Sequence, residues 1–219
     1  MGRGLKKALP LIISLLSIYA CATTQVKKEG YLTASWYGPG FHGRPTASGQ
    51  IYDMYALTCA HKSLPFGTKL RITNTINGKS VDVVVNDRGP FVDGRDIDLS
   101  YGAARKIGLV GRGTSEVFVE YIGRDYSYIK SAKFDAPIYG PFTIQVGSFK
   151  EIENAQRLKS ALELGYKGVY MTRAVLDGVP YYRVRIGRFS DRKTALRNAS
   201  VLAEEGYQVI VVGYDEPNL

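Results

Sequence analysis

The sequence predicts two domains in tandem, a small closed β-barrel followed by an α+β sandwich. Residues 31–123 hold many short strand-like stretches separated by glycine, proline and asparagine turn signals, with a single helical pattern among them. Such a pattern is typical of a small closed barrel. Residues 140–219 contain an internal repeat, because Ile144–Phe149 is matched forty residues later by Val184–Phe189. A strand that recurs in this way predicts a duplicated unit.

A hairpin is predicted near the middle of the barrel. Lys69–Thr75 and Lys79–Val85 flank the dipeptide Asn77-Gly78, which best tolerates the positive φ values of a type I′ turn. In the second of these strands valines alternate with other residues, so one face is apolar and is expected to face the core.

The end of the barrel is predicted to hold a short helix and a last strand. Ser100 is a plausible N-cap for a helix over Tyr101–Ile107, and Gly108 is placed to end it as the C′ residue. Val117–Ile122 has the pattern of a strand.

The second domain has the order of a split βαβ sandwich. In each copy of the repeat an alanine-bearing amphipathic helix follows the strand, and the helices end at Gly165-Tyr166 and Gly206-Tyr207. Strand, helix and strand, twice over, give a β-α-β-β-α-β fold of four strands with both helices on one face. Coincidence is the alternative for so short a repeat. Residues 124–139 lack periodicity and are interpreted as a linker or an ordered strap.

The first twenty residues resemble a secretory signal. A basic start precedes the apolar run Ala8–Ala20, which is too short to cross a bilayer. The run ends in a sequence similar to a bacterial lipobox, so Cys21 is expected to become a diacylated N-terminal residue, with 21–30 as its tether. The alternative is an ordinary signal with a cysteine there by chance. Ala22 is no aspartate, which resembles the pattern that allows export to the outer membrane.

Composition limits the remaining function classes. Without the signal, 26 basic and 20 acidic residues remain and the formal net charge falls from +9 to +6. That charge is too small and too dispersed for a nucleic-acid binder. Cys59 is the only other cysteine, so no disulfide can form within the lipidated chain, and Cys59 is interpreted as a small buried hydrophobe.

Two residues carry the candidate chemistry. Asp87 follows a β-branched strand and precedes Arg88-Gly89-Pro90, so the chain turns there and lifts a carboxylate to the barrel rim. His61 also follows a strand-like run. Together in a groove they could share a proton and shift each other's pKa. In the alternative, Asp87 caps its own turn and His61 is a surface residue.

Further acidic and aromatic residues surround these two. Asp96 and Asp98 alternate with apolar neighbours and could join a carboxylate cluster, but no calcium-loop or zinc-ligand spacing is present, so we predict no metal site. Asp98 is expected to support the loop of Arg88 or the helix start. Four aromatic residues could stack on a sugar ring or simply fill the core: Trp36, Tyr37, Phe41 and Tyr52.

The first domain closely resembles the rare lipoprotein A family of septal-ring lytic transglycosylases. The similarity covers nearly the whole domain, and its motifs are Ala34-Ser35-Trp36-Tyr37-Gly38, Phe41-His42-Gly43-Arg44-Pro45-Thr46-Ala47-Ser48-Gly49, Ile51-Tyr52-Asp53-Met54, Ala56-Leu57-Thr58, Ala60-His61-Lys62, Leu64-Pro65-Phe66-Gly67-Thr68, Asn86-Asp87-Arg88-Gly89-Pro90-Phe91 and Ile97-Asp98-Leu99-Ser100.

The resemblance implies a six-stranded double-psi β-barrel over 31–123 that cleaves peptidoglycan glycan strands and prefers strands stripped of stem peptides. It assigns Asp87 as the catalytic aspartate and His61 as an active-site histidine. Asp98 and Arg88 are our own candidates for supporting residues. Gln50 stands where the family often has Glu. Because an amide cannot exchange a titrating proton, Gln50 keeps at most a hydrogen-bonding role.

Residues 140–219 resemble a ferredoxin-like SPOR domain, which implies binding of denuded glycan at the division septum. The glycan-binding residues carried over are Gln145, Ser148, Tyr181 and Ile210. Strand alternation supports this independently, since Tyr181, Arg183 and Arg185 are expected on the sheet face away from the helices. A merely solvated sheet is the alternative.

These inferences predict a monomeric outer-membrane lipoprotein, facing the periplasm and enriched at the septum, that cuts denuded peptidoglycan without a cofactor. Two alternatives remain open at this stage. The barrel could grip glycan without cleaving it, as expansin-type barrels do, or the chain could be a structural lipoprotein that bridges membrane and wall.

Overall fold

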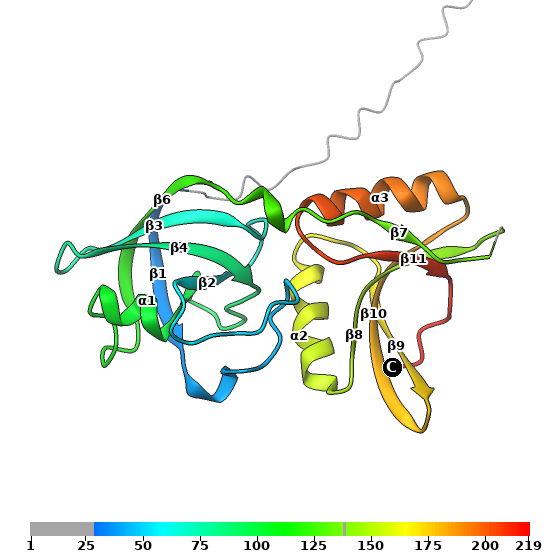
Figure 1. The fold of residues 1–219 in the computed structure, drawn as a ribbon, viewed down its shortest axis with the longest axis horizontal. Coiled ribbons are helices and arrows are strands. Elements are labelled where there is room, and N and C mark those ends of the chain that lie inside the picture. The colour runs from blue at the N-terminus through cyan, green and yellow to red at the C-terminus, as the bar shows by residue number, and fades with distance from the viewer. Residues whose placement is uncertain (1–28, 138) are drawn as a thin grey trace, which may run out of the picture.

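The computed structural model describes residues 29–137 and 139–219 and contains two domains joined by an ordered segment (Figure 1). The predicted signal over 1–20 and the lipidation site Cys21 lie outside the described residues. In the described part, no helix combines the length and the apolar character needed to cross a membrane.

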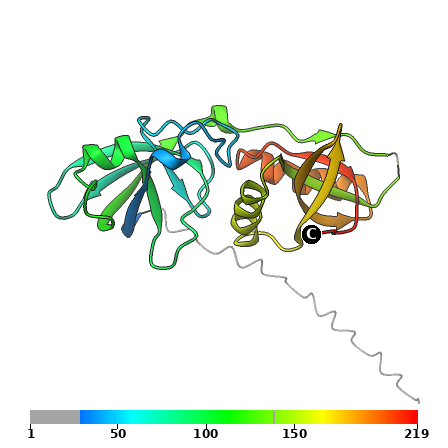
Figure 2. The ribbon, with the colours of Figure 1, turned by 90° about the horizontal axis from the view of Figure 1, so that it is seen from below.

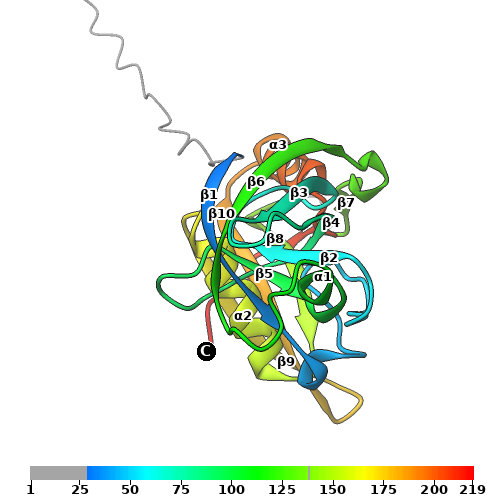
Figure 3. The same ribbon diagram turned by 90° about the vertical axis from the view of Figure 1, so that its left-hand side faces the viewer.

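The first domain is a closed six-stranded barrel with the strand order β1-β5-β2-β4-β3-β6, as predicted. Strands β1 and β5 pair in parallel, as do β2 and β4, whereas the other neighbours are antiparallel. Figure 3 views the molecule from the barrel side. Its elements are β1 (Gly30–Tyr37), a 3-10 turn η1 (Pro39–Phe41), β2 (Thr58–His61), β3 (Thr68–Asn74), β4 (Ser80–Asp87), β5 (Ile97–Ser100), α1 (Tyr101–Lys106) and β6 (Ser115–Arg124).

The barrel core comes from the inward side of the alternating strands. In β4 the valines 81, 83 and 85 are all buried, and in β3 Leu70 and Ile72 are fully buried beside them. Each such side chain contributes about 1.5–3 kcal/mol by leaving water. This packed interior holds the strand ends rigidly, so side chains at the rim have fixed positions.

The hairpin between β3 and β4 differs from the predicted type I′ turn. Of the described non-glycine residues only Asp177 has a positive φ, so Asn77 does not adopt the required conformation. The loop is longer, with the Asn74 N–H donating to the Lys79 carbonyl (2.9 Å). Asn77 instead donates from its side chain to the Ile107 carbonyl (3.1 Å), and this tertiary contact overrides the local preference.

Helix α1 follows the prediction closely and anchors the long loop between β1 and β2. The Ser100 hydroxyl accepts the Ala103 N–H (3.2 Å), and Gly108 has φ +69° just past the helix end. Gly102 lies so close to that loop that a Cβ would be 2.3 Å from the Tyr55 carbonyl oxygen. The loop is therefore fixed against the barrel before it reaches the rim.

The second domain is an α+β sandwich with the predicted β-α-β-β-α-β order. Its sheet has five strands rather than four, in the order β7-β11-β8-β10-β9, because part of the linker pairs in parallel with the edge strand β11 and so covers that edge. The elements are a 3-10 turn η2 (Tyr126–Tyr128), β7 (Lys133–Phe134), β8 (Phe142–Phe149), α2 (Ile152–Glu163), β9 (Val169–Leu176), β10 (Val179–Phe189), α3 (Arg192–Glu204) and β11 (Ile210–Gly213).

Both helices cover one face of this sheet, and α2 lies between the sheet and the barrel (Figures 1 and 2). The second domain thus meets the barrel with α2 and with the end of α3, not with its open sheet face.

Candidate active site

Asp87 ends strand β4 at the barrel rim, where Gly89 (φ +134°) and the cis bond Gly89–Pro90 turn the chain away. Its Oδ1 accepts two backbone N–H groups, from Ala47 (2.9 Å) and from Arg88 (2.8 Å). The turn-capping alternative is therefore partly realised, because one carboxylate oxygen holds the turn and the overlying loop. Among the described residues, no hydrogen bond is made to Oδ2.

The free oxygen belongs to a carboxyl that lines a cavity of about 40 Å³. Burial is the largest influence on Asp87 and raises its pKa, although the two N–H donors and the positive charges of Arg157 and Arg88 act in the opposite direction. A carboxyl with a raised pKa keeps its proton closer to neutral pH, as a general acid requires.

Gln50 lies on the loop that covers Asp87. Its Oε1 accepts hydrogen bonds from Asn86 Nδ2 (3.1 Å) and from the Tyr128 hydroxyl (2.9 Å) of the inter-domain segment. The predicted hydrogen-bonding role therefore matches the geometry. Both donors point at one amide oxygen, so Gln50 joins the loop to β4 and to η2.

The Arg88 side chain contacts residues of both domains. Its Nη1 donates to the Leu64 carbonyl (2.9 Å) and its Nε to the Tyr207 hydroxyl (2.6 Å). The guanidinium also lies 3.8 Å from the centroid of the Phe66 ring. Arg88 is only 7% exposed, so these contacts are made away from bulk water.

His61 is the last residue of β2, and its ring is buried. Nδ1 accepts the N–H groups of Ser63 (3.2 Å) and Leu64 (3.0 Å), which places the proton of the neutral imidazole on Nε2. Burial first, and then the charge of Arg88, lower the pKa of His61 to about 4. In the described part of the chain no hydrogen bond or ion pair joins His61 to Asp87, so the structure does not unite them as an acid-base pair.

The low pKa of His61 predicts an acid sensitivity of the fold. Between the ordinary pKa of 6.5 and about 4, the unfolded chain binds a proton that the folded chain does not, so stability falls as pH drops through that window. The loss is on the order of 3 kcal/mol. His61→Asn keeps an acceptor near Nδ1 and should flatten this dependence, as measured by urea unfolding at pH 7 and pH 4. Equal pH slopes in the two proteins would contradict the assignment.

Asp98 is a supporting residue, but not in the place expected. Its carboxylate accepts the Ser35 hydroxyl on the neighbouring strand β1 and pairs with Arg95 Nη2 (2.6 Å). It therefore braces β5 against β1 and the preceding loop, rather than the loop of Arg88. The described residues contain no group of three or more histidine, cysteine or acidic side chains arranged to hold a metal ion.

The aromatic residues near the site divide into core and surface. Tyr52 is buried and stacks on Tyr37 with ring centroids 4.3 Å apart, and Trp36 packs against Tyr101. Burial, followed by the charge of Asp87, raises the pKa of the Tyr37 hydroxyl. Phe41 alone is well exposed, at 40%, and Arg157 of α2 lies 5.5 Å from the centroid of its ring, so of the four it has the most surface left to meet a ligand.

A second candidate site lies on the sheet of the second domain. Strand register places Gln145 opposite Ile210 and Ile210 opposite Lys133, so the three side chains form a row on one face. These residues and Ser148 line a groove of about 480 Å³, together with Lys130 and Gln208. Tyr181 is not among the lining residues, because it lies four residues before Arg185, the position on β10 that is opposite Gln145.

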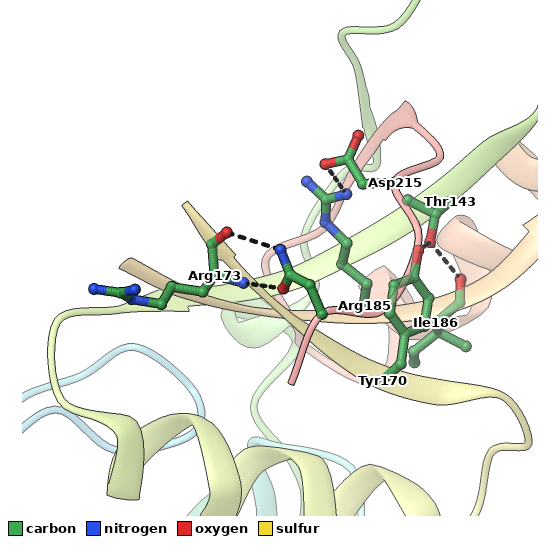
Figure 4. Close-up of polar contacts among 7 residues, drawn as sticks. Thr143, Tyr170, Arg173, Arg185, Ile186 and Asp215 are labelled. Atoms are coloured by element: carbon green, nitrogen blue, oxygen red, sulfur yellow. Dashed lines mark hydrogen bonds and ion pairs between the residues drawn. The ribbon is translucent and has the colours of Figure 1, made fainter. Parts of the chain in front are cut away.

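Arg185 was expected on the open face of the sheet, but its side chain is covered. It is only 2% exposed, because its Nη1 donates to Asp215 Oδ2 (2.6 Å) in the C-terminal segment. Asn218 of the same segment bonds the backbone of Arg173 on β9 (Figure 4). The C-terminal residues thus cover the β9 side of this face and leave the β11 side, with the groove, accessible.

Four contributors to the candidate active site were not singled out in the sequence. They are the Ala47 N–H group, Tyr128, Arg157 and Tyr207, and three of them come from outside the barrel. Only Tyr207 left a signal, since it belongs to the repeated Gly-Tyr at the helix ends, and that signal pointed to the duplication rather than to a contact.

Comparison with known proteins agrees with both domain assignments. A lytic transglycolase family model matches residues 30–119 and a SPOR domain model matches residues 139–213. Proteins named endolytic peptidoglycan transglycosylase RlpA are similar to this chain. That of Vibrio cholerae is 50% identical over 59% of this chain and 49% of its own length, and that of Helicobacter pylori is 36% identical over 74% and 57%.

A third relative is more similar over a shorter stretch. The RlpA protein of Pseudomonas aeruginosa is 58% identical over 90 residues, which are 41% of this chain and 26% of that protein. The chain spans about half the length of the first two relatives that it matches. The chain therefore combines a barrel of the lytic transglycolase family with a SPOR domain, and it is similar to the rare lipoprotein A (RlpA) proteins.

Proposed function

We propose that this protein is a lytic transglycosylase that cleaves the glycan strands of peptidoglycan. The observation that carries the proposal is the carboxyl of Asp87, which is half-buried at the barrel rim, has a raised pKa and leaves Oδ2 free beside a cavity. The names of the RlpA relatives support the same activity.

One carboxyl suffices for this reaction. The Asp87 proton passes to the glycosidic oxygen between N-acetylmuramic acid and N-acetylglucosamine as the bond to muramoyl C1 breaks. The muramoyl 6-hydroxyl then bonds to C1, and its proton returns to the Asp87 carboxylate. No water is consumed, so a second carboxylate to activate water is not needed, in contrast to the common hydrolases.

The neighbours of Asp87 fit supporting roles in this scheme. Ala47 and Arg88 hold Oδ1 with their N–H groups, which orients Oδ2 toward the substrate. Since Gln50 cannot titrate, we assign it the positioning of the overlying loop through Asn86 and Tyr128. His61 remains a predicted active-site residue whose neutral ring holds the turn at Ser63 and Leu64.

Incubation of the protein with glycan strands lacking stem peptides, followed by mass spectrometry of the products, tests the activity. We expect 1,6-anhydromuramoyl ends. Intact glycan that is nevertheless pulled down by the protein would instead favour a binding module, and hydrolysed reducing ends would exclude the transglycosylase mechanism.

We further propose that the SPOR groove selects denuded strands by their charge. Removal of a stem peptide leaves a free lactyl carboxylate on each muramic acid, so a denuded strand is a regular polyanion. Lys130 and Lys133 line the groove beside Gln145 and Ile210, and neither lysine is in an ion pair within the described residues. Their ammonium groups are thus free to meet those carboxylates.

The pair Lys130→Gln with Lys133→Gln should bind denuded strands about three- to tenfold more weakly at low salt, because exposed charge pairs contribute roughly 0.2–1 kcal/mol each. Binding to strands whose carboxylates have been converted to amides should hardly change. Titration calorimetry with both strands measures this, and Lys150→Gln with Lys193→Gln, outside the groove, is the control. Equal losses for the two strands would exclude carboxylate recognition.

We also propose that the protein is a monomeric lipoprotein, anchored through Cys21 in the outer membrane and enriched at the division septum through the SPOR domain. The lipobox-like sequence before Cys21 and the SPOR family match support this. The mass of the mature N-terminal peptide tests the anchor, since an unmodified N-terminus after position 21 would overturn it. Membrane fractionation, fluorescence microscopy and light scattering test the other claims.

A further inference from the structure

The SPOR domain is docked directly on the catalytic rim of the barrel. Two backbone bonds join the domains and the linker, from Phe66 N–H to the Glu205 carbonyl (2.9 Å) and from Lys130 N–H to the Ala203 carbonyl (2.9 Å). Arg124, at the end of β6, donates to the Glu204 carbonyl (2.5 Å). The end of α3 is therefore held against the barrel by specific polar contacts.

The centre of this interface is packed as tightly as a domain core. Phe66 and Tyr207 meet edge to face with centroids 4.9 Å apart, and the Arg88 guanidinium lies against both rings. All three residues are at most 7% exposed. At Gly206 (φ +101°) a Cβ would lie 2.9 Å from Phe66 Cβ, so the loop approaches this closely only because it has no side chain there.

The docked domain also narrows the site itself. Arg157 and Leu158 of α2 and Phe149 of β8 line the same cavity as Asp87, and Tyr128 bonds Gln50. The cavity measures about 40 Å³. A water needs roughly 10–15 Å³ on this measure, so the space left beside Asp87 holds only a few waters, far less than a disaccharide occupies.

We propose that the docked SPOR domain is an autoinhibitory cap, which must move away from the barrel before a glycan strand can reach Asp87. The inference rests on the proposed function only in naming the strand as the excluded substrate. In this proposal the two domains have two arrangements, and the docked arrangement described here is the inhibited one.

The geometry also couples the cap to the glycan groove. Gln208 and Val209 line the groove, and they directly follow Tyr207 in the sequence, whose hydroxyl accepts a hydrogen bond from Arg88. Lys130 also lines the groove, and its N–H donates to the Ala203 carbonyl. A strand in the groove therefore contacts the segments that dock. A ligand shifts such an equilibrium when it binds one arrangement more tightly, and a long strand gains its second binding site, the barrel, only in the open arrangement.

Amide hydrogen exchange in the full chain tests the cap. With Asp87→Asn, which prevents cleavage, saturating denuded strands should speed exchange of the Phe66 amide by about tenfold or more, because this barrel amide bonds the Glu205 carbonyl across the interface. Amides inside β3 and β4 should not change. If shifts at Gln145 show that a strand is bound while exchange of the Phe66 amide stays unchanged, the proposal is overturned, whether or not the wild-type protein cleaves glycan.

Loosening the interface provides an independent test. Arg124→Ala removes the bonds to the Glu204 and Phe66 carbonyls without touching Asp87. It should speed Phe66 exchange without ligand and raise turnover of a short denuded tetrasaccharide about tenfold, the equivalent of one or two lost hydrogen bonds. Arg112→Ala, an exposed barrel arginine, is the matched control. Faster Phe66 exchange with unchanged or lower turnover would show that docking does not inhibit.

Discussion

Replacement of Asp87 by asparagine is expected to abolish the formation of anhydromuramoyl ends and to leave the fold intact. Asparagine keeps an oxygen for the N–H groups of Ala47 and Arg88 but has no proton to give. Because one residue acts as acid and then as base, the loss should reach at least the 10²–10⁴-fold typical of general acid-base catalysis. Product counting by mass spectrometry measures it.

Thermal unfolding separates this loss from instability. Burial raises the pKa of Asp87, so the ionised carboxylate opposes folding at pH values above its folded pKa, and the stability contributed by the protonated form is lost as pH rises through that value. Asp87→Asn should therefore be as stable as the wild type at pH 7, or slightly more stable. Asp82→Asn, on the exposed side of the same strand, is the matched control and should retain activity. Wild-type turnover by Asp87→Asn would remove Asp87 from the mechanism.

The sequence contained enough local information to predict the elements of both domains. Alternating valines in β4, the Ser100 cap of α1 and the strand-helix repeat each report on contacts within a few residues or across one sheet. The turn at Asn77-Gly78 was mispredicted because Asn77 bonds the distant Ile107 carbonyl. A local preference of this kind yields when a tertiary hydrogen bond satisfies a buried group.

The composition of the candidate site was only half predictable. Asp87 was found because its strand and turn are adjacent in sequence, whereas Tyr128 and Tyr207 reach Gln50 and Arg88 from 78 and 119 positions away. No periodicity within either domain records how the two domains meet. His61 and Asp87 lie on paired strands, since Ala60 is opposite Asp87, yet within the described residues no hydrogen bond or ion pair joins their side chains.

The alternation of side chains along β8 and β11 correctly predicted that Gln145 and Ile210 lie on one face of the sheet. Replacing both residues is expected to have the second large effect, a loss of glycan binding. Gln145→Ala with Ile210→Ala should weaken binding of denuded strands by about a hundredfold. An apolar platform contributes roughly 1–2 kcal/mol and a hydrogen bond to the ligand about 0.5–1.5 kcal/mol. Titration calorimetry on the full chain measures the change, with Asp87→Asn present to prevent cleavage.

The matched control for that pair lies on the helices, on the other side of the same sheet. Gln156→Ala with Val201→Ala removes an exposed amide and a half-exposed valine there, so binding should stay within about twofold of wild type.

Tyr181→Ala tests how far the site extends along β10. Because Tyr181 does not line the groove, this variant should weaken binding of a tetrasaccharide far less than the Gln145 and Ile210 pair does. If Tyr181→Ala alone weakens binding as much as the pair does, the glycan runs along β10 toward its first residues, and the groove beside β11 is not the principal binding site. If neither variant weakens binding, this face of the sheet does not bind glycan.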